Sequence, residues 1–184
     1  IFLNNDNTFK AGNYSLSKKD NTKTIINKIK NGEVDDNSIT LTFLEGKRLL
    51  DYVNIIASNF NYSKDDIIKD IQSKEFLTSL IDKYWFLTRD ILNNKIYYAL
   101  EGYLYPDTYT FSKDATTYDI VTKMLDNTSA KLDDYKDPIQ NSDYSYHEIL
   151  TLASIVELEA ALKDDRAMVT SVFFNRLKAG WTLG

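Results

Sequence analysis

The densest hydrophobic pattern in the chain follows a helix-start signal near residue 145. Ser145 and Glu148 have the Ser-x-x-Glu spacing of a capping box, in which each side chain binds a free backbone amide at the start of a helix. Apolar residues then fill most positions from Ile149 to Leu162, too many for one narrow stripe. The pattern therefore predicts a core helix that is covered on most sides.

A second helix is predicted directly after the first. Asp164 or Asp165 can cap its start, and Gly180 is a stop signal at its end. Asn175 and Arg176 fall in its last turn, where capping or interaction with the helix dipole is the simpler explanation and ligand contact the functional one. The apolar residues of one face are Met168, Val169, Val172, Phe173 and Leu177. The two helices should form a hairpin.

Two carboxylates, Glu157 and Glu159, interrupt the first helix. At about 100° per residue they point about 200° apart, so they cannot share one site. Glu159 lies four residues before Lys163, which favours a surface ion pair. Glu157 is bordered by small side chains that leave room for a ligand, and a partly desolvated carboxyl can act as a general acid. Those small neighbours are Ala153, Ser154, Ala160 and Ala161. The alternative, that Glu157 pairs with an Arg or Lys from elsewhere in the chain, stays open.

The N-terminal part of the chain predicts a small β-α-β unit. Residues 9–16 have the pattern of a strand with a glycine turn, and residues 38–44 that of a second strand. Between them, Asn21 or Thr22 can cap a helix that ends near Gly32. A unit of about 40 residues is too small to be stable alone, so we expect it to pack on the rest of the chain. Its functional interpretation is a carbohydrate-binding module.

Helices are also predicted in the middle of the chain. The first runs over residues 49–60 and the second over 64–73 with Ser63 as its cap, and residues 75–93 continue with a weaker helical period. Residues 133–143 are polar and contain a proline, which predicts a solvated loop.

The stretch LEGYLYPDTYTF at residues 100–111 is rich in aromatic residues and is interrupted by Gly102 and Pro106. It suits a strand or turn that lines a cleft, because sugar rings present apolar faces and polar edges that tyrosine can meet together. The alternative is a tyrosine-rich core, since most aromatic positions are structural. The polar groups available there are Glu101, Asp107 and Thr108.

Composition narrows the classes of function. The 184 residues carry a net charge of −5 with 22 dispersed basic residues, so a nucleic-acid surface is not expected. The chain has no cysteine and one histidine, which excludes a Cys/His zinc site, and we predict neither metal nor cofactor. That histidine, His147, is expected to be exposed. No apolar run has the length of a membrane span and no signal peptide is visible. Because the chain starts at Ile1 and stops at Gly184 in mid-pattern, we expect it to be a fragment.

Three stretches together resemble the endolytic murein transglycosylase family, the YceG-like proteins. They are LEGYLYPDTYTF at 100–111, LTLASIVELEA at 150–160, and SVFFNRL with a following glycine at 171–180. The resemblance implies an α+β fold in two parts. Residues 1–40 would form a LysM-like β-α-β module, and residues 41–184 a mainly helical catalytic domain with a short sheet.

The resemblance implies that Glu157 is the catalytic residue of a lyase. Glu157 would protonate the glycosidic oxygen between MurNAc and GlcNAc and then, as a base, help the sugar's own 6-hydroxyl attack, leaving a 1,6-anhydro end and terminating elongation of the nascent strand. One carboxylate can serve both steps, whereas hydrolases generally need two. The predicted substrate-binding residues are Glu101, Tyr103, Asp107, Thr108, Tyr109, Ser154 and Asn175. We predict that four of them, Tyr103, Asp107, Thr108 and Tyr109, lie on the same cleft as Glu157.

The resemblance also implies a setting for the protein. Family members are anchored by a single membrane span with this region outside the cytoplasm, and they act on peptidoglycan beside penicillin-binding proteins and other wall-synthesis proteins. They continue past the point that corresponds to Gly184, so we expect part of the cleft to lie beyond it. Two other hypotheses stay open. One is a glycoside hydrolase that uses Glu157 with Asp107 or Glu101, and the other is a non-catalytic wall-binding module that acts through its LysM-like part.

Overall fold

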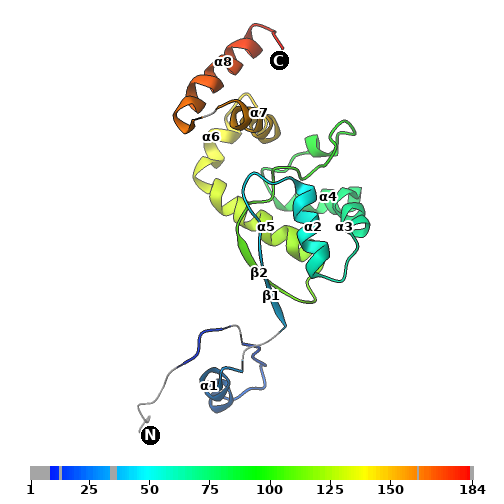
Figure 1. The fold of residues 1–184 in the computed structure, drawn as a ribbon, viewed down its shortest axis with the longest axis vertical. Helices are drawn as coiled ribbons and strands as arrows, with labels where there is room; N and C mark the ends of the chain where they lie inside the picture. The colour runs from blue at the N-terminus through cyan, green and yellow to red at the C-terminus, as the bar shows by residue number, and fades with distance from the viewer. Residues whose placement is uncertain (1–8, 13, 34–36, 161, 183–184) are drawn as a thin grey trace.

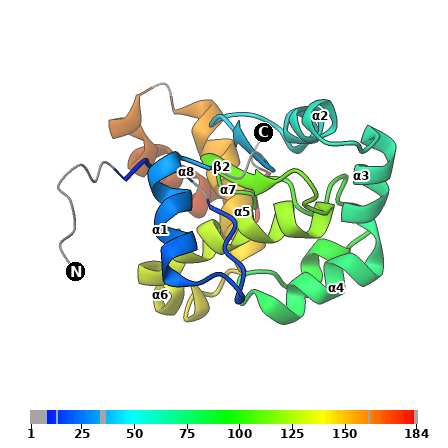
Figure 2. The ribbon, with the colours of Figure 1, turned by 90° about the horizontal axis from the view of Figure 1, so that it is seen from below.

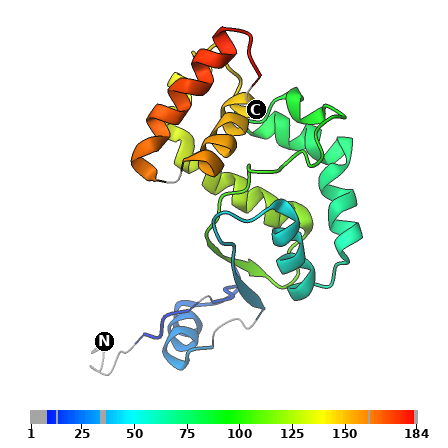
Figure 3. The ribbon, with the colours of Figure 1, turned by 45° about the horizontal axis from the view of Figure 1, so that its top comes forward.

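The computed structural model describes residues 9–12, 14–33, 37–160 and 162–182. Helix α1 (Thr22–Asn31) lies at one end of the elongated molecule, and helices α7 (Tyr146–Glu159) and α8 (Arg166–Lys178) lie at the other (Figures 1 and 3). The main hydrophobic core lies between these two ends.

The start and the end predicted for helix α1 are confirmed. The side chain of Asn21 accepts a hydrogen bond from the backbone N–H of Thr24, and the helix ends at Gly32. The strand predicted at residues 9–16 is not formed in the described residues 9–12 and 14–16. A polar network joins this segment to the helix instead.

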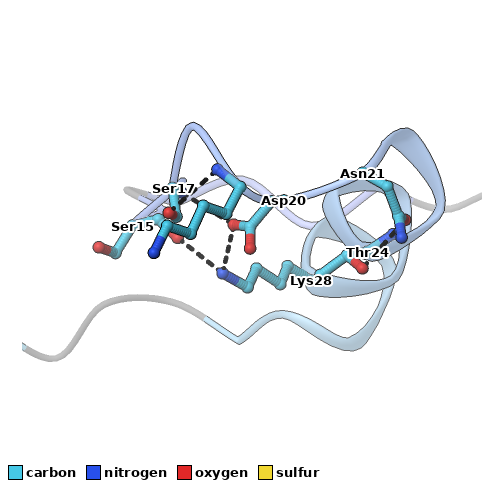
Figure 4. A network of polar contacts seen from close by, with 7 residues as sticks. Ser15, Ser17, Asp20, Asn21, Thr24 and Lys28 are labelled. Carbon is cyan, nitrogen blue, oxygen red and sulfur yellow. Dashed lines mark hydrogen bonds and ion pairs between the residues drawn. The ribbon is translucent and has the colours of Figure 1, made fainter.

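That network is centred on Lys28 (Figure 4). Its ammonium group donates to the Asp20 carboxylate at 2.8 Å and to the carbonyl of Ser15 at 3.0 Å. Asp20 also accepts from the backbone N–H of Ser17 at 2.9 Å. The hydrogen bonds from Lys28 and from Ser17 hold the pKa of Asp20 below its ordinary value. Side-chain contacts thus hold the segment before α1 without a strand.

The sheet has two strands, and they come from distant parts of the chain. Strand β1 (Ser38–Thr42) pairs antiparallel with β2 (Thr108–Ser112), so that Thr40 faces Thr110. Leu41, Tyr109 and Phe111 are buried on one face, whereas threonine hydroxyls pair across the other. The short sheet and the α+β class are confirmed. The second strand of the predicted N-terminal unit therefore pairs with the aromatic stretch.

Three of the predicted helical regions are present in the chain between β1 and β2. Helices α2 (Leu49–Asn59) and α3 (Lys64–Gln72) match their predicted spans, and the side chain of Ser63 caps α3. The third region is divided into α4 (Lys74–Lys83) and a short 3-10 helix, η1 (Arg89–Leu92).

Helix α5 (Thr117–Leu132) has no counterpart in the prediction. Figure 2 shows it crossing the middle of the molecule, with α3 and α4 to one side. Its side chains Ile120, Met124 and Leu125 have no exposed surface. This helix is therefore the centre of the core.

The prediction of a loop at residues 133–143 is wrong for residues 133–140, which are helical. A 3-10 helix, η2 (Asp133–Tyr135), leads into helix α6 (Lys136–Gln140). Pro138 lies in the first turn of α6, where proline is tolerated because the amide it lacks would have no helical partner.

Helices α7 and α8 form the predicted hairpin, joined through a 3-10 helix, η3 (Lys163–Asp165). The capping box of Ser145 and Glu148 is present, and Asp165 stands at the N-cap of α8 without a side-chain cap bond. A small second core of Val156, Ala160 and Phe173 joins the helices.

The prediction that α7 is covered on most sides is wrong. Leu158 is 86% exposed and Leu162, just past the helix, is 66% exposed. The reason is that, among the described residues, the apolar contacts of α7 lie in two places: Tyr146 and Leu150 contact the main core, and Val156 belongs to the second core shared with α8. Within the described ranges, no helix has both the length and the apolar character needed to span a bilayer.

Candidate active site

A cavity of about 660 Å³ lies between α7 and α8. Most of its wall is apolar, and the charged side chains in it are Glu148, Glu157 and Arg166. The remaining lining residues are Tyr144, His147, Ile149, Thr151, Leu152, Ala153, Ile155, Val156, Thr170, Phe174 and Leu177. The predicted catalytic residue thus lies in the wall of a cavity large enough for a sugar.

Glu157 is ion-paired with Arg166. The distance from Arg166 Nη2 to Glu157 Oε2 is 2.7 Å, and the two side chains are 43% and 63% exposed, respectively. The alternative that the sequence left open, a pair with an Arg or Lys from elsewhere, is therefore present in the structure. Pairs this exposed contribute about 0–1 kcal/mol because water screens the charges. The ion pair engages Oε2 of Glu157 and not Oε1.

The surface pair predicted between Glu159 and Lys163 is not present in the described residues. Helix α7 ends at Glu159, so Lys163 does not lie one turn further along the same helix. Glu159 does not line the cavity.

The small residues around Glu157 have different surroundings. Ala153 lines the cavity, whereas Ala160 is buried in the second core, outside the helix. The Ser154 hydroxyl donates to the carbonyl of Thr151, one turn back along α7. Ala161 lies outside the described residues. Space beside Glu157 therefore comes from the gap between two helices more than from a face of small residues.

The aromatic stretch of residues 100–111 packs against the first turns of α7 through Gly102 and Tyr103. Gly102 has a positive φ of 79°, and a Cβ atom there would come within 3.2 Å of Leu150 Cδ2. Tyr103 is 1% exposed, and its ring stacks on His147 with centroids 6.1 Å apart. These contacts fix where α7 leaves the main core.

His147 is half-buried and hydrogen-bonded, so the expectation that it is exposed is wrong. Its Nδ1 lies 2.9 Å from the hydroxyl of Tyr103. Burial raises the pKa of Tyr103, which keeps the hydroxyl protonated, and this buried donor has no other acceptor among the described residues. We therefore assign Tyr103 as the donor and Nδ1 as the acceptor, which places the proton of the neutral imidazole on Nε2.

The other predicted substrate-binding residues also have structural partners. Glu101 Oε1 accepts from the N–H of Leu49 at 2.9 Å and so caps α2. Asp107 accepts from the backbone N–H of Thr108 and from the side chain of Asn127, and these two bonds hold the pKa of Asp107 below its ordinary value.

None of the predicted substrate-binding residues lines the cavity beside Glu157. Tyr109 is buried and donates its hydroxyl proton to the carbonyl of Tyr105. Asn175 is exposed in the last turn of α8, where its carbonyl accepts from Ala179. The full set is Glu101, Tyr103, Asp107, Thr108, Tyr109, Ser154 and Asn175. Contact between these residues and a glycan stays a prediction.

Replacing Tyr103 with Phe should destabilise the protein by about 1 kcal/mol, because it removes the hydrogen bond to His147 and keeps the ring. The thermal midpoint should fall by about 2 to 4 °C for a chain of this size. Tyr97→Phe is the matched control, since Tyr97 is 86% exposed. Nitrogen-15 NMR of the imidazole should show the Nε2–H tautomer in the parent and a mixture in Tyr103→Phe. A parent with its proton on Nδ1 would contradict the assignment.

Sequence reasoning missed two residues of this site, Arg166 and His147. Arg166 stands at the first position of α8, directly opposite the end of α7, and the hairpin prediction alone places it near Glu157. Nothing local in the sequence indicates the partner of His147, because Tyr103 is distant in the chain and meets it only through the fold.

The fold and the site together define a mainly helical α+β chain with a carboxylate-bearing cavity in its C-terminal hairpin. A model of the YceG-like family matches residues 1–184, and the chain belongs to that family.

Two named relatives are similar in sequence. An endolytic murein transglycosylase of Bacillus subtilis (strain 168) is 36% identical over 172 residues, which are 92% of this chain and 48% of the relative. One of Streptococcus pneumoniae serotype 2 is 30% identical over 179 residues, 91% of this chain and 32% of the relative. The chain therefore spans half or less of the length of these relatives.

A crystal structure of a YceG-like protein from Listeria monocytogenes has the same fold. It aligns with a TM-score of 0.72 and 38% sequence identity, over 95% of this chain and 58% of the other.

Proposed function

We propose that the protein containing this chain is an endolytic lytic transglycosylase of peptidoglycan, with Glu157 as its single acid and base. The proposal is supported by the relatives' names and by the place of Glu157 in the cavity wall. The bond cleaved would join MurNAc to GlcNAc in a nascent strand.

The reaction needs no water and returns the carboxyl to its starting state. Glu157 gives its proton to the glycosidic oxygen as the bond from that oxygen to C1 of MurNAc breaks. The C6 hydroxyl oxygen of the same sugar then bonds to C1, and its proton passes to Glu157. The products are a 1,6-anhydro end and a free GlcNAc hydroxyl, which would end growth of the strand.

The observation that carries the proposal is the arrangement of carboxylates around the cavity. Among the described lining residues they are Glu148 and Glu157. These positions are about 13 Å apart along the axis of α7, at about 1.5 Å per residue. The two carboxyls of a hydrolase are about 5 to 9.5 Å apart. Glu148 also accepts from the backbone N–H of Ser145 at 2.8 Å, which commits it to the cap. This arrangement favours a lyase over a two-carboxylate hydrolase.

We also propose the setting that the family resemblance implies. Residues 1–40 would form a LysM-like module, whose helix α1 lies at the opposite end of the molecule from α7, and would bind the same glycan strand. The complete protein would be held in the cell membrane by one span, with this region outside the cytoplasm. Penicillin-binding proteins and other wall-synthesis proteins would be its partners.

Product analysis tests the proposal. Purified peptidoglycan strands are incubated with the complete protein and the fragments are analysed by mass spectrometry. We expect 1,6-anhydroMurNAc ends and internal cleavage. Reducing MurNAc ends would instead support the hydrolase. Strand binding without any fragment, unchanged in Glu157→Gln, would support the non-catalytic wall-binding module.

A further inference from the structure

Arg166 has a hydrogen-bond donor that the described residues do not use. Its Nη2 pairs with Glu157 at 2.7 Å, whereas its Nε is buried and has no hydrogen-bond partner in the described part of the chain. Buried polar groups nearly always have a partner, so an orphan N–H beside a cavity needs an explanation. Arg166 lines the cavity, so we take as the acceptor an oxygen of a bound molecule that replaces the Glu157 carboxylate at the guanidinium.

The chemistry of this donor selects an anion. Among the described lining residues, Arg166 is the only permanently charged cation in a mostly apolar wall. The other charged side chains of the described lining are the carboxylates Glu148 and Glu157, so the guanidinium is not part of a basic cluster in this cavity. The edge of a guanidinium formed by Nε and one Nη matches the two oxygens of a carboxylate. A phosphate would match this edge too, but the group that the proposed glycan substrate offers is a carboxylate.

The pair with Glu157 can be exchanged for such a group. Both side chains are partly exposed, at 43% for Arg166 and 63% for Glu157, and the pair occupies only Oε2 of the carboxyl. Exposed pairs are weak because each charge is also well solvated when alone. A ligand carboxylate that uses both Nε and Nη2 would replace a single contact with two.

We propose that Arg166 binds a carboxylate of the glycan substrate, and that this exchange releases Glu157 to act on the glycosidic bond. The proposal rests on the proposed function, since it names the substrate group that the same site recognises. The carboxylate has two possible sources, the lactyl group of MurNAc in a strand without peptides and the acidic residues of a stem peptide. Both present the same chemistry to Arg166.

Binding measurements test the proposal without any turnover. The complete protein is titrated by calorimetry with peptide-free GlcNAc–MurNAc oligomers, either with free lactyl carboxylates or with these converted to methyl amides. A second pair of oligomers carries stem peptides whose side carboxylates are free or amidated. We expect the carboxylate form of at least one pair to bind about tenfold more tightly, as for a charge-assisted hydrogen bond. The pair that shows the preference identifies the source.

Variants of Arg166 and Glu157 make the test specific. Arg166→Gln should remove the preference for the carboxylate form, and Arg166→Lys should keep part of it. Lys178→Gln is the control, because it removes the same charge from an exposed position of α8 outside the cavity. Glu157→Gln should tighten binding of the carboxylate form alone, because the competing partner of Arg166 is then neutral.

Three outcomes would overturn the proposal. One is equal affinity of the parent for both forms in both pairs. Another is equal weakening of both forms in Arg166→Gln, which would make Arg166 only a positioning residue for Glu157. The third is unchanged binding of the carboxylate form in Glu157→Gln. These results do not depend on product formation, so failure of the proposed reaction, seen as absent anhydro ends, is separate from failure of carboxylate recognition.

Discussion

Glu157→Gln should abolish formation of anhydro ends by the complete protein, while Glu159→Gln should keep most of it. Both residues lie in the last turns of α7, but only Glu157 lines the cavity. Glutamine keeps the shape of the side chain and can still accept a hydrogen bond from Arg166, yet it cannot exchange a proton with the substrate. Loss of a general acid and base reduces turnover by roughly 10²- to 10⁴-fold, so the effect should appear in kcat.

Thermal midpoints distinguish the loss of a catalytic group from a loss of folded protein. The ion pair that Glu157→Gln weakens is exposed and contributes at most about 1 kcal/mol, so the thermal midpoint should move by no more than about 4 °C. Glu159 makes no ion pair in the described part of the chain, and Glu159→Gln should change the midpoint even less. Anhydro products are quantified by mass spectrometry beside the midpoints of both variants and the parent. An inactive Glu159→Gln with an active Glu157→Gln would refute the assignment.

Helix starts were the part of the fold most open to prediction from sequence. The caps at Asn21, Ser63 and Ser145 are each present, because a cap involves residues only three positions apart. Helix α5 carries the same kind of signal, a capping box between Thr116 and Asp119, with Asp in place of the more familiar Glu. A definition of the capping box that accepts Asp at its fourth position therefore predicts the start of α5.

Partners distant in the chain were beyond prediction. The sequence could say that Glu157 either stands free or pairs with a cation, but the choice depends on where α7 ends and how α8 returns. In the same way, β1 pairs with a strand that comes after four helical segments, not with a neighbour in its own module. Local periodicity indicates which face of a strand is buried, but it does not identify which distant strand is its partner.

Tyrosine-rich composition could not distinguish a cleft from a core. Tyr103 and Tyr109 are buried, with hydroxyls bonded to His147 and to the carbonyl of Tyr105. Aromatic rings with a polar tip suit both environments, since a buried hydroxyl needs only one partner to be tolerated. The surroundings of these side chains match the alternative of a tyrosine-rich core. Their relation to the site is indirect, through the placement of α7.

Gly102→Ala should be the most damaging small substitution in the aromatic stretch. Gly102 has a φ of 79°, which costs an alanine roughly 1 to 2 kcal/mol, and the new Cβ would lie 3.2 Å from Leu150 Cδ2. Overpacking of a well-filled contact adds about 1 kcal/mol or more. We expect a total loss of about 2 to 3 kcal/mol in the free energy of unfolding. Leu150 belongs to α7, and its side chain must move by a few tenths of an ångström to relieve the contact.

Gly46→Ala is the matched control for this prediction. Gly46 has a similar φ of 68°, but a Cβ atom there meets nothing within 4 Å, so Gly46→Ala should lose only the roughly 1 to 2 kcal/mol of backbone strain. The difference between the two variants measures the contact with Leu150, and the double variant Gly102→Ala with Leu150→Val should recover part of it. Denaturant unfolding gives these free energies. A misplacement of about 1 Å can reduce turnover about 10²-fold, so the smaller adjustment at Leu150 should lower the turnover of Gly102→Ala by less than this, while Gly46→Ala keeps full activity. Equal stability losses in both variants, with full activity in each, would show that Gly102 does not place α7.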